Sequence, residues 1–538
     1  MNPDGISYLN ISDYYREGDF GAATNAYWSP LFPWFLAQML RLFDPSIYWE
    51  APIAHLAIFV TYLISFAAFR YLLRQARPEP HTGAHALTGA SGPSYAEGLA
   101  YATFLYSSLV LIGLTVVTPD HLVAAIAYGI GGLLAGAMRP QGKLIRYAMI
   151  GTLAGVGYLA KSPMFPAGLL AIAISFAISL RSSPHRMAGP AIAVACFALL
   201  SAPQMAAVSR VAGHLTFADT GRLSYGMIVN NYGFLWPENP PVGSGTPVNR
   251  VRTLENDPPV FQFSRVKKHS SFPLWDDPAY WNAGMKLVLS PGLQMRATKE
   301  VLKVYWLAGW PLIVAVAGCL IISRTPPRRD GWPLVALGGG MLVLYSLVHA
   351  EPRFIAPWMI LLFLGINQFV ASSRRGQQVA IARLRLAVCG ILLFMVGRQA
   401  TRDLRGAYGN RAGTWHPSVD IATWLRARDV ADHGAVAILG NPFNTYWARL
   451  ARTQIVVHMP EEDVKRYWEA GPERRAEINE RMRGAGVGTV IASHVDTSAS
   501  AEGWEKIGDT GLYARALIAK QGKLLESSPF SVLPDGAD

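Results

Sequence analysis

Several ionisable side chains stand at the ends of apolar segments, and all of them fall on the same side of the series of segments. They are Asp4, Asp120, Lys161, Asp276, Asp277, Glu351 and Arg353. Carboxylates in such places can take a proton or hold a metal ion, and cations can bind an anion. The connections on the other side carry mostly Arg, Lys and uncharged polar residues. Ionisable groups gathered at one surface of a membrane indicate a functional site at that surface.

Each of these residues also has a structural explanation. An aspartate at the head of a helix, as Asp4 and Asp120 are predicted to be, commonly caps free amide groups. A lysine after an apolar run, such as Lys161, commonly extends its ammonium group to the interface, and Glu351 could simply neutralise Arg353. Lys161, however, lies on the side where the positive-inside trend predicts few cations, so it needs a negative partner. A phosphate at the level of the headgroups would suit both Lys161 and Arg353.

The elements that position these residues are predicted to be membrane spans. Of the 538 residues, 51% are hydrophobic and 16% are charged, and the mean hydropathy is +0.22. This composition is too apolar for a soluble chain of this length. Ten apolar segments are long enough to cross a bilayer. They cover residues 51–74, 95–117, 120–138, 144–160, 164–181, 188–208, 298–323, 331–349, 354–372 and 381–399.

The basic residues of the connections set the predicted orientation. Basic connections alternate with the others along the chain, and the positive-inside rule places them in the cytoplasm. They are 70–93, 139–146, 181–186, 324–329 and 374–385. The remaining segments are then outside: 1–50, 117–120, 161–163, 209–297, 350–353 and 400–538. Much of the net charge of +12 lies in the cytoplasmic connections, so we predict no nucleic-acid partner.

The spans divide the chain into five predicted parts. They are an outer segment with interfacial helices (1–50), membrane helices (51–208), a large outer loop (209–297), further membrane helices (298–399) and an outer α/β domain (400–538). The predicted fold class is therefore an α-helical polytopic membrane protein with a small C-terminal α/β domain.

The first and last parts have distinct patterns. Apolar spacing predicts one helix over 7–18, ended by Gly18, and another over 31–44 that is too short to span. No apolar span precedes Asp4. Either the amino terminus crosses the membrane unaided or another span lies upstream, and we expect the second.

In the last part, β-rich runs at 436–440, 454–459 and 487–493 alternate with helical runs at 418–428, 460–470 and 472–484.

The segment WDDPAYW at 275–281 combines aromatic rings with two carboxylates. Rings that stack and carboxylates that accept hydrogen bonds from hydroxyls suit sugar binding, and an interfacial aromatic belt has the same composition. The spacing does not decide between these two interpretations.

The sequence has no HExxH and no CxxC motif and no Ser-His-Asp order, so hydrolase and zinc-site functions lack support.

Taken in order, the motifs resemble the GT-C superfamily of integral-membrane glycosyltransferases that use polyprenyl-phosphate sugars. The similarity is greatest to the bacterial branch that contains protein O-mannosyltransferases and aminoarabinose transferases. The matching motifs, which cover about residues 1–400, are DGISYLNIS at 4–12, NAYWSPLFPWFLA at 25–37, VTPDHLVAA at 117–125, YLAKSPMFP at 158–166, WDDPAYW at 275–281 and HAEPRFIAP at 349–357. The chain departs from the family pattern in lacking a span before the first acidic loop.

The resemblance implies transfer of a sugar from a polyprenyl-phosphate donor to an acceptor hydroxyl, with inversion, at the outer face of the bacterial cytoplasmic (inner) membrane. The catalytic carboxylates fall on Asp4 and Asp120, and the donor phosphate falls near Lys161 and Arg353. Expected substrate contacts are Tyr8, Trp28, Trp275, Asp276, Asp277, Trp281 and Glu351. The sequence establishes no cofactor, and a divalent cation (Mg²⁺ or Mn²⁺) on Asp4 and Asp120 is left open. The expected partners are the bilayer, the lipid-linked sugar and a glycan, lipid or protein acceptor.

Two other functions fit the sequence. A lipid or sugar transporter, or a flippase, would also be polytopic, although transporters more often show repeat symmetry and polar groups near the midplane of the membrane. A catalytically inactive scaffold would fit a chain without the usual first span. Transfer of radiolabelled sugar from a membrane lipid separates these three functions.

Overall fold

The computed structural model describes residues 1–76, 95–138, 144–182, 187–323, 331–369, 375–409, 417–428, 430, 434–493 and 502–517. The chain forms two compact units, each made of two stretches of sequence. The helical unit is Met1–Asn249 with Asp277–Ala412, and the sheet unit is Arg250–Asp276 with Gly413–Asp538.

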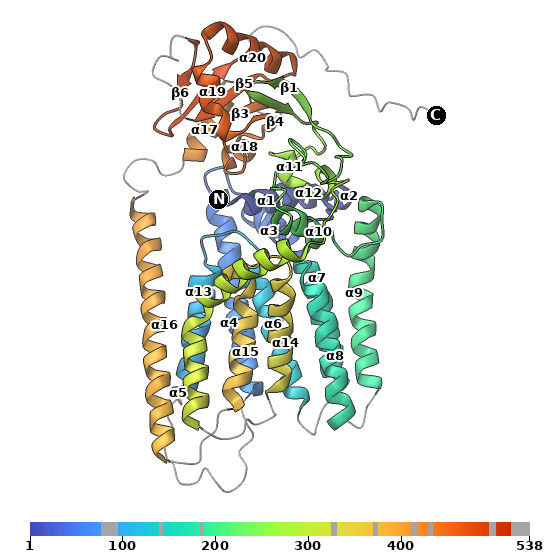
Figure 1. Ribbon diagram of the computed structural model, residues 1–538, viewed down its shortest axis with the longest axis vertical. Helices are drawn as coiled ribbons and strands as arrows, with labels where there is room; N and C mark the ends of the chain where they lie inside the picture. The colour runs from blue at the N-terminus through green and yellow to red at the C-terminus, as the bar shows by residue number, and fades with distance from the viewer. Residues whose placement is uncertain are drawn as a thin grey trace. The chain divides into compact units, whose positions relative to one another are not determined.

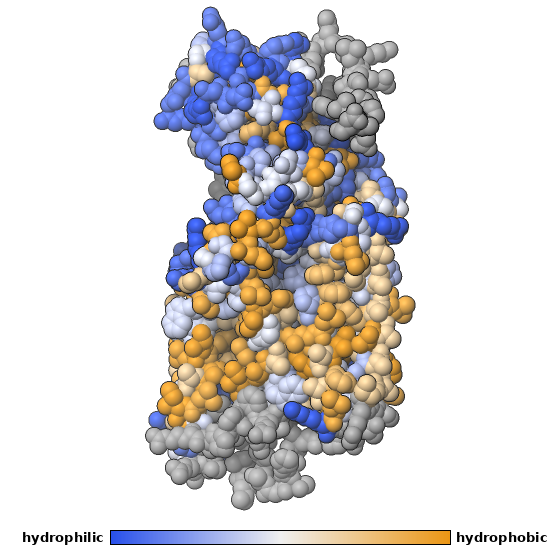
Figure 2. All heavy atoms as spheres, turned by 45° about the vertical axis from the view of Figure 1, so that its right-hand side comes forward, coloured by the Kyte–Doolittle hydropathy of each residue, from blue (hydrophilic) through white to orange (hydrophobic). Residues whose placement is uncertain are grey.

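Ten long helices of the helical unit coincide with the ten predicted spans, and Figure 1 shows them running side by side. They are α4 (Glu50–Ala76), α5 (Tyr95–Tyr106) continued by the π-helix η1 (Ser107–Ile112), α6 (Asp120–Ala137), α7 (Leu144–Ala160), α8 (Met164–Ser182), α9 (Ala188–Ala212), α13 (Pro291–Ser323), α14 (Trp332–Ser346), α15 (Pro352–Phe369) and α16 (Arg375–Gly409). Among the described residues, seven helices are long and apolar enough to cross a membrane, and α7, α14 and α15 are shorter apolar helices. On the face that Figure 2 shows, hydrophobic side chains cover most of the surface over these helices.

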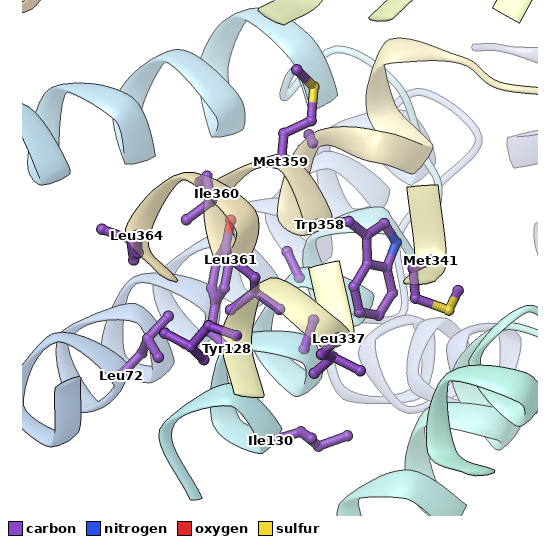
Figure 3. Packing of buried hydrophobic residues seen from close by; sticks show 14 of the residues in the cluster. Leu72, Tyr128, Ile130, Leu337, Met341, Trp358, Met359, Ile360, Leu361 and Leu364 are labelled. Atoms are coloured by element: carbon purple, nitrogen blue, oxygen red, sulfur yellow. The ribbon is translucent and has the colours of Figure 1, made fainter. Parts of the chain in front are cut away.

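The core of this bundle takes buried side chains from α4 to α9 and from α13 to α16. Figure 3 shows Tyr128 of α6, Leu337 of α14 and Leu361 of α15 packed together, and all three are buried. At Gly338, α14 lies so close to α15 that a Cβ atom would stand 2.6 Å from the carbonyl oxygen of Trp358. The absence of a side chain at Gly338 therefore allows α14 to approach α15, the helix that carries Arg353, this closely.

We predict that Gly338→Ala lowers the stability of the protein. The new methyl group would meet backbone atoms of α15, which cannot move aside as a flexible side chain can, and such overpacking costs roughly 1–3 kcal/mol. Thermal unfolding of the purified protein measures the effect. The control is Gly339→Ala on the same helix, where a Cβ atom would meet nothing within 4 Å. Equal stability of the two variants would contradict the close contact between α14 and α15.

Two helices predicted in the first fifty residues are confirmed. They are α1 (Pro3–Glu17), which Gly18 ends with φ of 84°, and α3 (Leu31–Phe43); the short α2 (Phe20–Ala23) lies between them. Helix α1 begins four residues earlier than predicted because Pro3 starts it, with Asn2 as the N-cap residue. Asp4 therefore stands inside the first turn of α1 and not at its cap. The rings of Tyr8 in α1 and Phe32 in α3 pack edge to face.

The remaining short helices of the helical unit are irregular connections. They are α10 (Thr220–Ser224), the π-helix η2 (Tyr225–Val229) and α12 (Pro278–Trp281). All lie within the segment predicted as a large outer loop, residues 209–297.

The sheet unit is built on a seven-stranded sheet with the order β1-β2-β4-β3-β5-β7-β6. Its strands are β1 (Arg252–Asn256), β2 (Pro259–Gln262), β3 (Ala435–Leu439), β4 (Gln454–Met459), β5 (Thr489–Ser493), β6 (Glu505–Lys506) and β7 (Leu512–Ala516). Strand β3 pairs in parallel with β4 and β5, whereas the outer pairs are antiparallel. The helices of this unit are α11 (Pro273–Asp276), α17 (Pro417–Arg426), α18 (Tyr446–Ala451), η4 (Glu461–Asp463), α19 (Val464–Glu469) and α20 (Pro472–Gly484).

The predicted fold class is confirmed, and the three strands predicted in the last part are β3, β4 and β5. The division of the chain differs from the predicted one at two places. Helix α16 continues to Gly409, beyond the predicted boundary at residue 400. Strands β1 and β2 come from the predicted outer loop, and β2 pairs with β4.

Candidate functional site

Four connections at one end of the helical bundle bring the predicted site residues together. Asp120 begins α6, Lys161 directly follows α7, and Arg353 lies in the first turn of α15. The fourth contributor is α1, whose start is attached to the connection before α6, because the backbone amide of Val117 donates to Oδ1 of Asn2 at 2.8 Å. This attachment places Asp4 beside Arg353.

Arg353 is the centre of the group. Its Nη2 donates to Oδ2 of Asp4 at 2.9 Å, and its Nε donates to Oε2 of Glu351 at 2.6 Å. Its Nη1 lies 3.7 Å from Oδ2 of Asp120. One guanidinium thus contacts three carboxylates from three parts of the chain. We call Asp4, Asp120, Lys161, Glu351 and Arg353 the carboxylate–cation cluster.

Asp120 is the most buried member of the cluster, with 2% of its side chain exposed. Its Oδ1 accepts a hydrogen bond from Nζ of Lys161 at 2.5 Å, and its Oδ2 accepts one from the hydroxyl of Thr118 at 2.8 Å. The ring of Phe354 lies beneath both cations, 3.9 Å from Nζ of Lys161 and 4.9 Å from Cζ of Arg353. Asp120 and Phe354 therefore keep the two cations close together. The carboxylate of Asp120 attracts both cations, and the ring face of Phe354 attracts them as well.

Asp4 is less buried, with 20% of its side chain exposed. Burial raises the pKa of Asp4, and the nearby Arg353 and Lys161 oppose that rise without cancelling it. A carboxylate whose pKa is raised toward neutral pH is a stronger base than an ordinary aspartate. Asp4 is thus the carboxylate of the cluster best suited to accept a proton.

Glu351 is held as an ion-pair partner of Arg353. Burial favours the neutral acid, but the hydrogen bond from His349 and the interaction with Arg353 outweigh it and lower the pKa of Glu351 to about 2. The Nε2 atom of His349 lies 3.3 Å from Oε1 of Glu351. The ion pair of Glu351 with Arg353, the structural explanation for Glu351 that the sequence suggested, is therefore present in the structure.

The capping explanation for the two aspartates does not match the structure. Helix α1 has Asn2 and helix α6 has Pro119 at the N-cap position. The carboxylates of Asp4 and Asp120 instead face cations from other helices. Their place in the first turn still suits a negative charge because of the helix dipole.

The cluster does not fit a divalent cation between Asp4 and Asp120. The guanidinium of Arg353 lies between these carboxylates, and Lys161 holds the other oxygen of Asp120. Within the described ranges, no group of three or more His, Cys, Asp or Glu residues is arranged to hold a metal ion.

The aromatic residues predicted to bind substrate lie in different surroundings. Tyr8 and Trp28 are buried, with ring centroids 5.0 Å apart in an edge-to-face contact. Burial raises the pKa of Tyr8, and the charges of Asp4 and Asp120 raise it further, so its hydroxyl stays neutral beside the cluster. Trp28 packs against Tyr8 and so supports the position of its ring.

The segment WDDPAYW is divided between the two units. Trp275 and Asp276 belong to the sheet unit, and Asp277 and Trp281 belong to the helical unit. Asp277 caps α12 by accepting a hydrogen bond from the amide of Tyr280, and Trp281 is buried. The structure gives Asp277 a local structural role, and a role of this segment in sugar binding stays a prediction.

Sequence reasoning missed Thr118, His349, Phe354 and Tyr27 as neighbours of the cluster. The hydroxyl of Tyr27 hydrogen bonds with Ser224, and burial raises its pKa, with Asp4 adding to the rise. One signal was available, because His349 and Glu351 stand two residues apart in the short segment just before α15, which carries Arg353. The contacts of Tyr27 and Phe354 depend on tertiary packing and leave no such pattern.

Comparison with known proteins identifies the fold. No protein-family model and no curated protein sequence matches the chain. Among solved structures, it is similar to ArnT from Cupriavidus metallidurans bound to undecaprenyl phosphate, with 11% identity and a TM-score of 0.51 over 97% of this chain and 94% of that chain. The apo structure of the same ArnT gives 11% identity and a TM-score of 0.50, over 96% of this chain and 93% of that one. The chain therefore has the GT-C fold that the sequence motifs predicted.

Proposed function

We propose that this protein is a glycosyltransferase of the bacterial cytoplasmic membrane that moves a sugar from a polyprenyl-phosphate donor to an acceptor hydroxyl. The observation that carries the proposal is the double contact of Arg353 with Asp4 and Asp120, with Lys161 beside it. A base and two cations at the ends of apolar helices are what the transfer of a sugar from a lipid phosphate requires. The shared fold with ArnT, which binds undecaprenyl phosphate in one structure, supports the same donor class.

The proposed reaction is a single displacement at the anomeric carbon. The acceptor oxygen forms a bond to that carbon while the bond from the carbon to the phosphate oxygen breaks. The acceptor proton passes to Asp4, and the electron pair of the broken bond stays on the phosphate. The products are the glycosylated acceptor, with inverted configuration, and the polyprenyl phosphate. Lys161 and Arg353 stabilise the charge that grows on the leaving phosphate.

The different burial of the two aspartates suggests different roles. Asp120 is deeply buried and both of its oxygens contact neighbouring side chains, so we assign it the positioning of Lys161 and Arg353. Asp4 is partly exposed and carries the raised pKa, so we assign it the role of general base. A general base in the right place contributes about 10²–10⁴-fold to the rate.

The donor phosphate must compete with carboxylates for the same cations. In the structure Arg353 holds Asp4, which keeps that carboxylate from an acceptor hydroxyl. A phosphate that binds Arg353 weakens this contact and leaves Asp4 available to take a proton. We therefore propose that the donor binds before the acceptor.

The central test is transfer of radiolabelled sugar in membranes that contain the protein. A panel of polyprenyl-phosphate sugars is offered as donors, and product is measured together with loss of label from the lipid. Label that reaches an acceptor supports the transferase. Label that crosses the membrane while still attached to lipid shows a flippase, and unchanged lipid with every donor shows an inactive scaffold.

We expect a metal chelator to leave transfer unchanged. The cations that contact the carboxylates here are Arg353 and Lys161, and a divalent ion in the same place would meet their positive charge. Transfer is measured after treatment with EDTA, with added Mg²⁺ or Mn²⁺ as the control. Loss of activity that either ion restores would contradict this arrangement.

The proposed orientation places the carboxyl terminus outside the cytoplasm. The ten helices of the bundle follow a first segment that carries Asp4, and the basic connections between them are assigned to the cytoplasm. A reporter that is active only in the cytoplasm should stay silent when fused after residue 538. The same reporter fused at residue 327, in a basic connection, should be active. The opposite pattern would invert the topology and place the cluster at the inner surface.

A further inference from the structure

The first half of α13 is oriented differently from the other long helices. Figure 1 shows that it lies obliquely across the ends of its neighbours before it turns to run beside them. Helix α13 has Pro311 in its interior, and a proline has no amide hydrogen to donate to the residue four positions earlier. An oblique segment of this kind lies at the membrane surface rather than through the bilayer.

One face of this segment is attached to the end of α14. Nε2 of Gln294 donates to the carbonyl of Leu347 at 3.0 Å, and the hydroxyl of Thr298 donates to the carbonyl of Ser346 at 3.3 Å. The hydroxyl of Tyr305 donates to the carbonyl of Leu342 at 2.5 Å. These contacts fix the rotation of α13 about its axis, and they decide which side chains face outward.

The outward side chains include three cations in one row. Arg296, Lys299 and Lys303 are exposed and lie three and four residues apart, so they fall within an arc of roughly 60° at 100° per residue. Glu300 pairs with Lys303 at 2.7 Å and is the one acidic residue of α13. The row therefore keeps a positive charge.

A row of exposed apolar side chains lies beside the cations. Met295 is 57% exposed, Leu302 is 54% exposed and Trp306 is 59% exposed, and the three fall within an arc of roughly 40° at 100° per residue. Tryptophan is favoured where the headgroups meet the acyl chains. An apolar row beside a basic row on an oblique helix is the pattern of a segment that lies in the headgroup region.

We propose that residues 291–306 of α13 form a docking surface for anionic phospholipids. The apolar row enters the outer part of the acyl region, and Arg296, Lys299 and Lys303 bind phosphate diesters that carry a net negative charge. A zwitterionic lipid has the same phosphate but also a cation, which the basic row would repel. The segment is hydrogen bonded to Ser346 and Leu347, which lead into the connection that carries His349 and Glu351. The inference does not rest on sugar transfer.

The test measures lipid binding by the purified, delipidated full-length protein through its thermal stability. Phosphatidylglycerol should raise the unfolding temperature of the wild type more than phosphatidylcholine does, since a ligand that binds the native state stabilises it. In the triple variant Arg296→Gln, Lys299→Gln, Lys303→Gln, the apparent affinity for phosphatidylglycerol should fall roughly tenfold or more, because each cation near an anionic surface strengthens attraction about fivefold. Glu300→Gln should have the opposite effect and strengthen binding. Inorganic phosphate should have the same effect on the wild type and on the triple variant of α13, because any binding at Lys161 and Arg353 is common to both.

A matched control removes three exposed cations from the sheet unit by Lys465→Gln, Arg483→Gln and Lys506→Gln. This variant should bind phosphatidylglycerol as the wild type does. If the triple variant of α13 fails to fold, two other variants still test the proposal. The exchange Arg296→Lys, Lys299→Arg, Lys303→Arg retains the charge and should retain binding of phosphatidylglycerol. Glu300→Gln adds one unit of positive charge and should strengthen that binding. Equal stabilisation of wild type and neutralised variant, equal effects of the two lipids, or an effect of inorganic phosphate that the triple variant loses would overturn the proposal.

Discussion

Replacement of Asp4 by Asn is expected to abolish sugar transfer and, at the same time, to strengthen donor binding. Loss of transfer follows because an amide cannot take the proton of the acceptor, and a general base contributes about 10²–10⁴-fold to the rate. Tighter donor binding follows because Arg353 loses a competing carboxylate at 2.9 Å. If Asp4 were only a structural ion-pair partner, the variant would lose stability and keep its turnover.

Two measurements on the same purified variant test both parts of this expectation. Turnover is followed with a labelled polyprenyl-phosphate sugar, and donor affinity is measured by titration with the same lipid. Asp13→Asn is the matched control, because Asp13 lies on the same helix and pairs with Arg16 at a distance of 3.5 Å. It should leave both quantities unchanged. Wild-type turnover of Asp4→Asn would remove Asp4 as the base.

The pH dependence of turnover gives a related expectation. Transfer requires Asp4 in its charged form, and burial raises its pKa above the ordinary value for aspartate. Activity should therefore fall on acidification at a higher pH than an unperturbed aspartate would give. The acid limb of kcat/KM reports this group in the free enzyme.

Removal of either cation of the cluster is expected to weaken donor binding strongly. Lys161→Ala and Arg353→Ala each remove a charge-assisted hydrogen bond to a partly desolvated phosphate, which costs roughly 1.5–3 kcal/mol, or about 10- to 150-fold in affinity. Arg353→Lys should also be impaired, because an ammonium group cannot contact three carboxylates and a phosphate in the fork geometry of a guanidinium. Arg402→Ala removes an exposed cation from α16 and should have no effect.

Stability measurements separate donor binding from a purely structural role. Arg353→Ala leaves Asp4, Asp120 and Glu351 without their shared partner, so some loss of stability is expected together with the loss of affinity. A structural role alone predicts that the folded fraction binds the donor normally and that the double change of Glu351 and Arg353 restores stability. Unaltered donor affinity in both alanine variants would remove the phosphate site.

The sequence was sufficient to predict the elements whose patterns are local. Ten apolar runs gave ten helices, and the alternating runs of the last part gave β3, β4 and β5. Gly18 ended α1 as expected because its φ of 84° suits a glycine. Strands β1 and β2 could not be predicted, since they are short and β2 pairs with β4 nearly two hundred residues away. Their pairing depends on tertiary structure and not on a pattern in their own residues.

The sequence indicated which residues belong to the candidate site, but it did not indicate which of them contact one another. The side of the membrane and the residue types indicated Asp4, Asp120, Lys161 and Arg353 as one group. That a single guanidinium reaches three carboxylates depends on the start of α1 at Pro3 and on the contact of Asn2 with Val117. Both are details of helix termini, which a sequence pattern locates only to within a few residues.

The contact of Arg353 with Asp4 has a consequence for how charge moves in the proposed reaction. Before transfer, Asp4 carries one negative charge and the donor, a phosphate diester, carries another. After transfer, Asp4 is neutral and the polyprenyl phosphate carries two. One unit of negative charge has therefore moved from one neighbour of the guanidinium to the other, while the total charge around Arg353 is unchanged. A fixed cation between the two sites stabilises the charge at both ends of its path, so the surrounding low-dielectric protein need not reorganise to follow it. The same argument implies that the dianionic product binds more tightly than the donor, and that its departure limits the rate of repeated turnover.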